Sequence, residues 1–160
     1  MDLGIKGKVA LVTGGSRGLG RQAALSLAAE GVNVAICGRT KDTLDGTVSD
    51  IKALGVDSLS VVADVSDQTG LDSLHAQVVT GLGHVDILVN NAGGSRARTD
   101  IAETSLDDYK TTFDLNLFGS FQLMRLAIPH MRSQGWGRII NIASIWGREQ
   151  GGNIPYMSAK

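Results

Sequence analysis

A glycine-rich turn that joins an apolar run to an amphipathic segment is the feature that most constrains this chain. The apolar run covers residues 8–13, the turn residues 14–20 and the amphipathic segment residues 21–31. This order is typical of a strand, a tight loop and a helix. Glycine allows positive φ and a close approach of the backbone to a ligand, and the first turn of a helix offers unpaired N–H groups to an anion. The stretch therefore predicts a loop that holds a pyrophosphate at the start of a helix.

The spacing of these glycines fits a dinucleotide-binding loop. Residues 18–23 read Gly-Leu-Gly-Arg-Gln-Ala and match the pattern G-x-G-x-x-G/A in its strand-to-helix context. A Walker-type phosphate loop is excluded, because no Lys-Ser or Lys-Thr follows the glycines. A structural glycine turn without a ligand is the alternative, since a single match of this kind is common. The loop residues that we expect to bind the cofactor are Gly14, Ser16, Arg17, Gly18, Leu19 and Gly20.

Short apolar runs alternate with helical segments along the rest of the chain. Further strands are expected at residues 32–37, 58–63, 85–89 and 136–143. Each run is mostly apolar without strict alternation, which indicates a parallel sheet covered on both faces. With right-handed crossovers, the predicted fold class is α/β: a doubly wound Rossmann-type sheet with helices on both faces, incomplete after its fifth strand. Residues 1–160 are expected to form a single domain.

Several helix boundaries and one helix face can be predicted from local signals. Ser66 is a candidate N-cap for the helix that follows the third strand. Thr104 and Ser105 each precede an aspartate by three residues, in the manner of a capping box, and introduce a long helix. Pro129 is expected to kink or end that helix. Its predicted apolar stripe comprises Tyr109, Phe113, Leu117, Phe121, Met124 and Ile128.

The composition excludes several classes of protein. A hydrophobic content of 42% with 19% charged residues indicates a globular chain, and a net charge of −1 gives no general attraction to nucleic acid or an anionic membrane. No apolar segment approaches about 18 residues, so neither a membrane span nor a secretory signal is expected. Cys37 is the only cysteine, which rules out an internal disulfide and favours the cytoplasm. No Cys/His ligand set accompanies it in the sequence, and no metal is expected.

The end of the second predicted strand indicates which nicotinamide cofactor is preferred. A carboxylate at this corner would hold the 2′-hydroxyl of NAD, whereas an arginine suits the 2′-phosphate of NADP. The chain has Gly38-Arg39-Thr40 there, and Arg17 in the glycine loop could reach the same phosphate. We therefore expect NADP(H), with NAD as the less favoured cofactor. The alternative is that both arginines are solvated surface residues.

Tyr156 and Lys160 are a candidate acid–base pair. They stand four residues apart, which on a helix places them on one face, one turn apart. A tyrosine hydroxyl, with an ordinary pKa of about 10, is a weak acid–base group at neutral pH. A neighbouring ammonium stabilises the phenolate, so that the hydroxyl can exchange the proton that accompanies hydride transfer at a carbonyl or carbinol. Without further signals, a surface tyrosine near a lysine is the alternative.

Together with the glycine loop, this pair resembles the short-chain dehydrogenase/reductase family. The motifs that carry the resemblance are Thr13-Gly14-x-x-x-Gly18-x-Gly20, Asn90-Asn91-Ala92-Gly93, Asn116, Ser144 and Tyr156-x-x-x-Lys160. They occur in the family order over residues 7–160. The glycine spacing is similar to that of the shorter-chained, single-domain branch, because the longer epimerase-like branch has glycine in place of Arg17.

The resemblance implies catalytic roles for four residues. Tyr156 would be the general acid in carbonyl reduction and the general base in alcohol oxidation. Lys160 would stabilise its phenolate and hydrogen-bond the nicotinamide ribose. Ser144 would hold the substrate oxygen, and Asn116 would hold a water that connects Lys160 to solvent.

The same resemblance implies further cofactor contacts. Asp64 would meet the adenine through its carboxylate and Val65 through its backbone N–H. The residues implied to line the cofactor site after the fourth strand are Asn91, Ala92 and Gly93. From the residues alone, a helix-capping Asp64 and a merely structural asparagine pair are the alternatives.

The chain differs from the family in stopping at Lys160, since family members run on well beyond the catalytic lysine. We therefore expect a piece of a longer protein: an NADP-dependent oxidoreductase acting on a secondary alcohol or ketone, similar to 3-oxoacyl-(acyl carrier protein) reductases or to sugar or polyol dehydrogenases. The full-length form would be a homo-oligomer, a dimer or tetramer. Substrate choice would fall to residues 94–98 and 145–154, where Trp146 is either a pocket wall or ordinary packing. The alternative is a catalytically silent nucleotide-binding module, or a half that another polypeptide complements.

Overall fold

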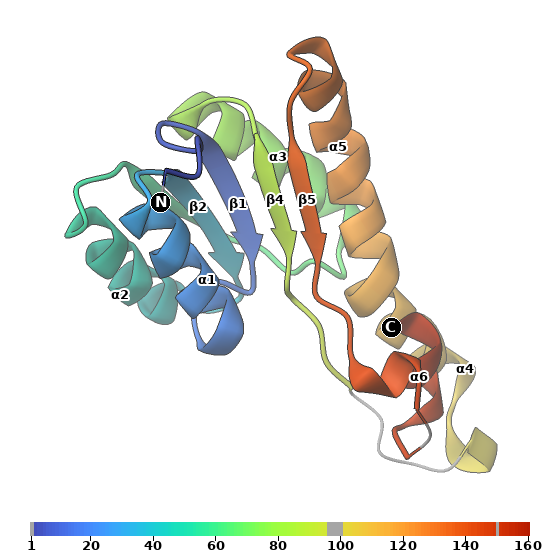
Figure 1. The fold of residues 1–160 in the computed structure, drawn as a ribbon. Coiled ribbons are helices and arrows are strands. Elements are labelled where there is room, and N and C mark those ends of the chain that lie inside the picture. Colours follow the sequence, from blue (N-terminus) through green and yellow to red (C-terminus); the bar gives the residue numbers. More distant parts are fainter. Residues whose placement is uncertain (1, 96–100, 150) are drawn as a thin grey trace.

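A five-stranded parallel sheet forms the centre of the computed structural model, which describes residues 2–95, 101–149 and 151–160 (Figure 1). The strands lie in the order β3-β2-β1-β4-β5, and each neighbouring pair is parallel. They are β1 (Val9–Thr13), β2 (Asn33–Gly38), β3 (Ser58–Val62), β4 (Ile87–Asn90) and β5 (Arg138–Asn141). Each strand overlaps one of the predicted apolar runs, which confirms the parallel sheet.

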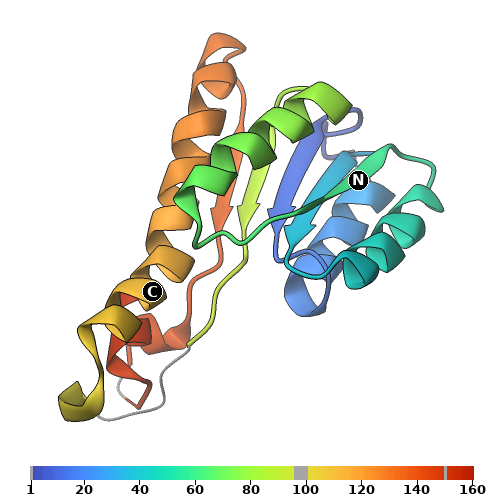
Figure 2. The same ribbon diagram turned by 180° about the vertical axis from the view of Figure 1, so that it is seen from behind.

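Helices cover both faces of this sheet (Figures 1 and 2). α1 (Gly18–Ala29) and α2 (Lys41–Lys52) pack on one face, and α3 (Gln68–Leu82) and α5 (Gly119–Ser133) on the other. Successive residues of β1 alternate between the two resulting cores, because side chains of a strand point to opposite faces. The shorter elements are η1 (Ile101–Glu103), α4 (Leu106–Phe113), the π-helical η2 (Asp114–Phe118), η3 (Ile145–Gly147) and α6 (Ile154–Ala159). The predicted doubly wound Rossmann-type fold is confirmed.

The strand order reverses beside β1. This strand pairs with β2 on one side and with β4 on the other, so the chain crosses to the second half of the sheet after β3. In doubly wound sheets, ligands bind outside the carboxyl ends of the strands at this reversal. The glycine loop after β1 and the loop after β4 lie at that place.

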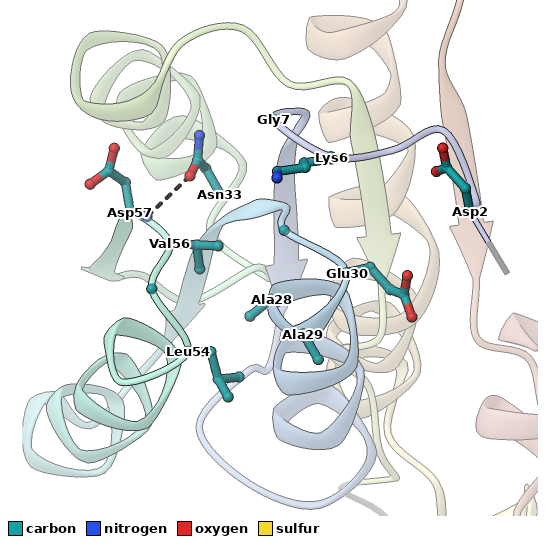
Figure 3. A pocket seen from close by; sticks show the side chains of 12 residues that line it. Asp2, Lys6, Gly7, Ala28, Ala29, Glu30, Asn33, Leu54, Val56 and Asp57 are labelled. Atoms are coloured by element: carbon teal, nitrogen blue, oxygen red, sulfur yellow. Dashed lines mark hydrogen bonds between the residues drawn. The ribbon is translucent and has the colours of Figure 1, made fainter.

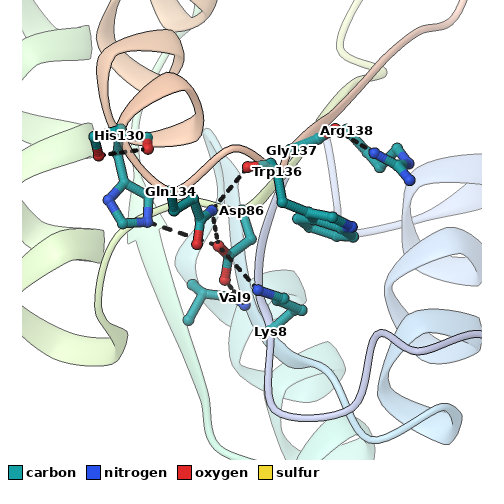
Figure 4. Close-up of polar contacts among 9 residues, drawn as sticks. Lys8, Val9, Asp86, His130, Gln134, Trp136, Gly137 and Arg138 are labelled. Carbon is teal, nitrogen blue, oxygen red and sulfur yellow. Dashed lines mark hydrogen bonds and ion pairs between the residues drawn. The ribbon is translucent and has the colours of Figure 1, made fainter.

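A buried carboxylate fastens the opposite, amino-terminal edge of the sheet (Figure 4). Asp86, just before β4, accepts hydrogen bonds from the backbone N–H of Val9 (3.0 Å) and from the side chain of Gln134 (2.5 Å). The side-chain nitrogens of Lys8 and His130 lie 3.8 and 3.7 Å from the same carboxylate. One side chain therefore joins the start of β1, the approach to β4 and the end of α5.

The long helix that runs from α4 through η2 into α5 buries a different face from the predicted one. Of the predicted stripe, Leu117 is 42% and Phe121 53% exposed. The residues that are buried are Thr112, Asn116, Gly119, Leu123, Ala127 and Met131. The prediction assumed that the most hydrophobic residues face the core, and it was wrong. Near the carboxyl edge of the sheet the helix faces the backbone of neighbouring loops, and the residues that fit there are small or polar, such as Gly119 and Asn116.

The predicted N-cap of α3 is wrong by one residue. Asp67, and not Ser66, caps the helix by accepting the N–H of Thr69 at 3.1 Å. Ser66 is engaged elsewhere: its N–H and hydroxyl both donate to the carboxylate of Asp64, at 2.9 and 2.7 Å. An ionised carboxylate is also the stronger acceptor for an unpaired helix N–H.

The start of the long helix and the effect of Pro129 were also predicted from the sequence. Ser105 is its N-cap and accepts the N–H of Asp108 at 3.1 Å, which confirms the predicted capping signal. Pro129 does not end the helix, since α5 continues beyond it. The proline removes only one helical hydrogen bond. Ala127 and Met131, which are buried on either side of it, hold the last turn in place. Within the described ranges, none of the helices combines the length and apolarity that crossing a membrane requires.

Candidate active site and cofactor-binding loops

The loop after β1 lies so close to its neighbours that two of its positions have no room for a side chain. A Cβ on Gly15 would lie 2.6 Å from the side chain of Ile36, and one on Gly20 would lie 2.3 Å from the carbonyl oxygen of Gly14. Gly14 and Gly18 have φ of 64° and 55°, which glycine adopts without strain. Helix α1 begins at Gly18, so its first N–H groups open beside this turn. The backbone therefore has the shape that phosphate binding requires.

The loop after β4 is tied directly to the glycine loop. Nδ2 of Asn91 donates to the carbonyl oxygens of Thr13 (2.9 Å) and Gly14 (3.3 Å). The Thr13 hydroxyl in turn accepts the backbone N–H groups of Asn91 (3.0 Å) and Ala92 (2.9 Å). Asn91 thus joins the two loops and brings Ala92 to the reversal point of the sheet.

The residues expected near the adenosine ribose lie at the same edge. Arg39 follows β2 and Arg17 precedes α1, and both side chains are exposed. Leu19 is 74% exposed in the first turn of α1. Ser16 lies beside the end of β2, with its hydroxyl 3.6 Å from where a Cβ on Gly38 would stand. Both guanidinium groups are therefore accessible to solvent on the side where a ribose phosphate is expected.

The loop after β3 is fixed through its backbone. Asp64 closes a tight turn by accepting from Ser66, and the N–H of Asp67 donates to the carbonyl of Asp64 at 3.0 Å. The Val65 side chain is only 6% exposed and belongs to the core under α3 and α5. Burial of this side chain sets the orientation of the peptide groups on either side of it.

Asn116 clamps the loop after β4 against the long helix. It lies in the π-turn η2 and is 7% exposed. Its Oδ1 accepts the N–H of Gly94 (3.0 Å), and its Nδ2 donates to the carbonyl oxygens of Gly94 (2.8 Å) and Thr112 (2.8 Å). A buried amide needs such partners, and here backbone groups supply them.

Lys160 and Tyr156 lie together at the end of the described chain. The Lys160 ammonium donates to the carbonyl oxygen of Ile142, just beyond β5, at 3.0 Å and lies 5.8 Å from the centre of the Tyr156 ring. Desolvation by burial lowers the pKa of the Lys160 amine. Helix α6 is capped by Asn153, whose side chain accepts the N–H of Tyr156 at 3.4 Å.

Three predicted site residues from distant parts of the chain converge at Gly93. A Cβ on Gly93 would lie 2.7 Å from Oδ1 of Asn116 and 2.8 Å from Nζ of Lys160. Only the absence of a side chain lets the loop after β4 meet both groups. The structure therefore brings the long helix, this loop and α6 to one point at the carboxyl edge of the sheet.

Ser144 lies on the neighbouring element. It caps η3, and its hydroxyl accepts the N–H of Trp146 at 3.3 Å. Element η3 packs against α6, which carries Tyr156. The Trp146 ring rests on the backbone of the approach to α6, since a Cβ on Gly151 would lie 2.9 Å from it, yet the residue is 38% exposed. Trp146 thus packs with one part of its ring and presents another to solvent.

A pocket lies away from these groups, at the amino-terminal edge of the sheet (Figure 3). It is lined by residues before β1 and between helices and the following strands, among them Lys6, Glu30, Asn33 and Asp57. The side chain of Asn33 accepts the N–H of Asp57 there at 3.0 Å. Because ligands of doubly wound sheets bind at the carboxyl edge, this pocket is not the candidate site.

Sequence reasoning missed two positions that shape the site. The carbonyl of Ile142 holds the Lys160 ammonium, and a backbone acceptor leaves no signal in a sequence. Gly119 meets the loop after β3, and a lone glycine in a helix is only a weak signal. Of the segments expected to choose the substrate, residues 96–98 and 150 lie outside the described residues.

The chain is similar to known proteins over nearly its whole length. The family model of "short chain dehydrogenase" matches residues 8–160. A (2S)-[(R)-hydroxy(phenyl)methyl]succinyl-CoA dehydrogenase subunit, BbsD of Thauera aromatica, is 37% identical over 158 residues, which cover 99% of this chain and 63% of that protein. The 3-oxoacyl-[acyl-carrier-protein] reductase FabG of Staphylococcus aureus (strain N315) is 41% identical over 141 residues, which cover 88% of this chain and 57% of that protein.

A solved structure agrees with the fold. The crystal structure of a protein of Sinorhizobium meliloti 1021, described as a short-chain alcohol dehydrogenase, matches with a TM-score of 0.89 and 34% identity. The match covers 97% of this chain and 62% of that one. The chain thus spans 57–63% of the length of these relatives.

Proposed function

The chain belongs to the short-chain dehydrogenase/reductase family of oxidoreductases, and from this premise we propose that it carries the NADP(H) site and catalytic residues of an enzyme that interconverts a ketone and a secondary alcohol. The observation that carries the proposal is the convergence of Lys160, Asn116 and Gly93 at the loop after β4, which Asn91 joins to the glycine loop. The amine of Lys160 is half-buried at the carboxyl edge of the sheet, and desolvation lowers its pKa. It suits a site where a proton and a hydride are exchanged.

The backbone of the glycine loop supports binding of a dinucleotide. The missing side chains at Gly15 and Gly20 leave a closely packed turn that opens onto the start of α1. Gly14, Ser16, Gly18 and Leu19 complete the cradle, while Asn91, Ala92 and Gly93 would line the nicotinamide side. Asp64 and Val65 would meet the adenine. When bound, the dinucleotide supplies or accepts the hydride.

A preference for NADP(H) over NAD(H) is supported by charge. Arg17 and Arg39 are exposed at the edge where the adenosine ribose would lie, and the corner after β2 reads Gly38-Arg39-Thr40, without a carboxylate for a ribose hydroxyl. Two guanidinium groups would bind a 2′-phosphate through charge-assisted hydrogen bonds.

The proton would pass through Tyr156. In reduction its hydroxyl would protonate the carbonyl oxygen as hydride reaches the carbon, and in oxidation the phenolate would take the alcohol proton. Lys160 would stabilise the phenolate electrostatically, and Ser144 would hold the substrate oxygen. Asn116 would keep the loop after β4 in place and pass a water to Lys160.

The names of the relatives favour an acyl thioester among the substrates considered. BbsD is named for a succinyl-CoA derivative and FabG for a 3-oxoacyl carrier protein. We therefore place a 3-oxoacyl or 3-hydroxyacyl thioester ahead of a sugar or polyol.

The outer face of the long helix supports a homo-oligomer, a dimer or tetramer. Leu117, Phe118 and Phe121 are 42%, 42% and 53% exposed on neighbouring turns. Large exposed apolar side chains that lie together mark an interaction surface. We place the enzyme in the cytoplasm, where the buried free thiol of Cys37 would persist.

Replacement of Tyr156 tests the mechanism. In the full-length protein, Tyr156→Phe should lower ketone-dependent oxidation of NADPH by about 100- to 10,000-fold, the usual contribution of general acid–base catalysis. The dissociation constant for NADPH should be nearly unchanged. Tyr109→Phe is the matched control, because Tyr109 stacks on Phe113 in the long helix, and it should keep its activity. Turnover retained in Tyr156→Phe would remove Tyr156 from the mechanism.

A further inference from the structure

Gly119 lies where the long helix touches the loop after β3. A Cβ on this residue would stand 2.2 Å from the carbonyl oxygen of Val65, 3.1 Å from its carbonyl carbon and 3.3 Å from its Cβ. The nearest obstacles are backbone atoms of a buried residue, so no rotation of a side chain could make room. The helix and this peptide group are in direct contact only because residue 119 has no side chain.

The loop on the other side of this contact is itself constrained. Asp64 closes a turn onto Ser66, and the Val65 side chain is buried in the core. Two side-chain hydrogen bonds join the long helix to α3. The amide of Gln68 in α3 donates to Asp114 at 3.4 Å, and the amide of Gln122 in α5 donates to Asp72 at 2.9 Å. The long helix is thus seated on the loop after β3 and the helix that follows it.

Gly119 also follows the π-turn that carries Asn116. One short stretch of helix therefore contacts both loops: Asn116 clamps Gly94 after β4, and Gly119 rests on Val65 after β3.

We propose that Gly119 is a positioning residue for the adenine side of the cofactor site: its missing side chain seats the long helix on the Val65 carbonyl and so sets the position of residues 64 and 65. The proposal rests on the proposed function, in which these two residues meet the adenine. Gly119 does not touch the cofactor and acts only through this peptide group.

Gly119→Ala tests the proposal, with Gly46→Ala as the matched control. Both glycines are helical, but a Cβ on Gly46 would meet nothing within 4 Å. Alanine is the better helix former, so propensity alone predicts no loss at either position. Binding is measured by calorimetry with three probes: NADPH, adenosine 2′,5′-bisphosphate for the adenine half, and reduced nicotinamide mononucleotide for the other half.

We expect Gly119→Ala to raise the dissociation constants for NADPH and adenosine 2′,5′-bisphosphate by about tenfold or more, while that for the mononucleotide stays unchanged. Gly46→Ala should leave all three unchanged. Equal weakening of all three probes by Gly119→Ala, or weakening of none, would overturn the proposal. If the unsubstituted chain bound neither NADPH nor the bisphosphate, the proposed function would fail, and the role of Gly119 with it.

Should Gly119→Ala not fold, hydrogen exchange in the unsubstituted chain decides. Adenosine 2′,5′-bisphosphate should slow exchange of the amides in residues 119–123, because a fixed Val65 peptide holds the helix start. The mononucleotide should not slow it. Equal exchange with and without the bisphosphate, while the bisphosphate is bound, would contradict the proposal.

Discussion

Substitution of Gly93 by alanine should disable the enzyme without unfolding it. The new Cβ would lie 2.8 Å from Nζ of Lys160 and 2.7 Å from Oδ1 of Asn116, whereas ordinary contacts lie at 3.4–4 Å. Both atoms must therefore retreat by about 0.6–0.7 Å. They are the tips of flexible side chains, so the retreat requires no movement of the backbone.

Gly93→Ala should therefore lower kcat much more than it lowers the free energy of unfolding. Folding loses at most the hydrogen bonds of the two displaced atoms, from the N–H of Gly94 to Oδ1 of Asn116 (3.0 Å) and from Lys160 to the carbonyl of Ile142 (3.0 Å), each worth about 1 kcal/mol. Catalysis loses the position of the amine that would stabilise the Tyr156 phenolate. A misplacement near 1 Å costs on the order of 100-fold in rate, so kcat should fall by about that factor.

Gly46 in α2, away from the candidate site, supplies the control. A Cβ on Gly46 would meet nothing within 4 Å, and its φ lies outside the left-handed region. Gly46→Ala should therefore keep the kcat of the unsubstituted enzyme. The assay is ketone-dependent loss of NADPH absorbance with a 3-oxoacyl thioester, alongside urea unfolding of both variants. If Gly93→Ala turned over as fast as Gly46→Ala, the contact with Lys160 would not govern catalysis and the prediction would be wrong.

Three further substitutions test the fold and the cofactor preference. Asp86→Ala should lower the free energy of unfolding by about 2–3 kcal/mol, because the buried N–H of Val9 loses an ionised acceptor; an unchanged urea midpoint would contradict this. Burial raises the pKa of the Cys37 thiol from 9.0 to about 12, so the stability that the protonated thiol contributes is complete below pH 9.0 and is lost as pH rises towards 12, at about 1.4 kcal/mol per pH unit. Unfolding measured at rising pH should show this loss in the unsubstituted chain and not in Cys37→Ala. Arg39→Asp should weaken binding of NADPH much more than binding of NADH; equal effects would show that Arg39 does not read the phosphate.

The fold was predictable because its signals are local. The central strands β1 and β2 are short apolar runs because their side chains are buried in the cores on both faces of the sheet, whereas the edge strand β5 is largely exposed. Gly31 after α1 and Gly55 after α2 have positive φ, a backbone conformation in which helices commonly end. The glycine loop and the order of the motifs then placed the candidate site at the reversal of the sheet.

The contacts that complete the site were not predictable from local signals. Lys160 is held by the carbonyl of Ile142, and Asn116 by the backbone of Gly94, so in each case one partner is a peptide group that any residue type could supply. The polar side chain of such a pair can be singled out from the sequence, but the backbone group that it binds cannot. Ser66 shows the converse: a residue type that suits a cap was bound instead by its neighbour Asp64.

The face of the long helix was mispredicted for a reason that also explains the site. The buried residues run from Thr112 to Met131, a separation of 19 positions, whereas five turns of a regular α-helix take about 18 residues. A regular helix would therefore carry the last of them about 100° away from the first. The π-turn at η2 accommodates one additional residue, which restores the alignment and keeps Asn116 and Gly119 on the same inner face as the apolar core further along. The helix thus contacts the two loops at one end and the core of the sheet at the other, while Leu117, Phe118 and Phe121 on its opposite side are exposed.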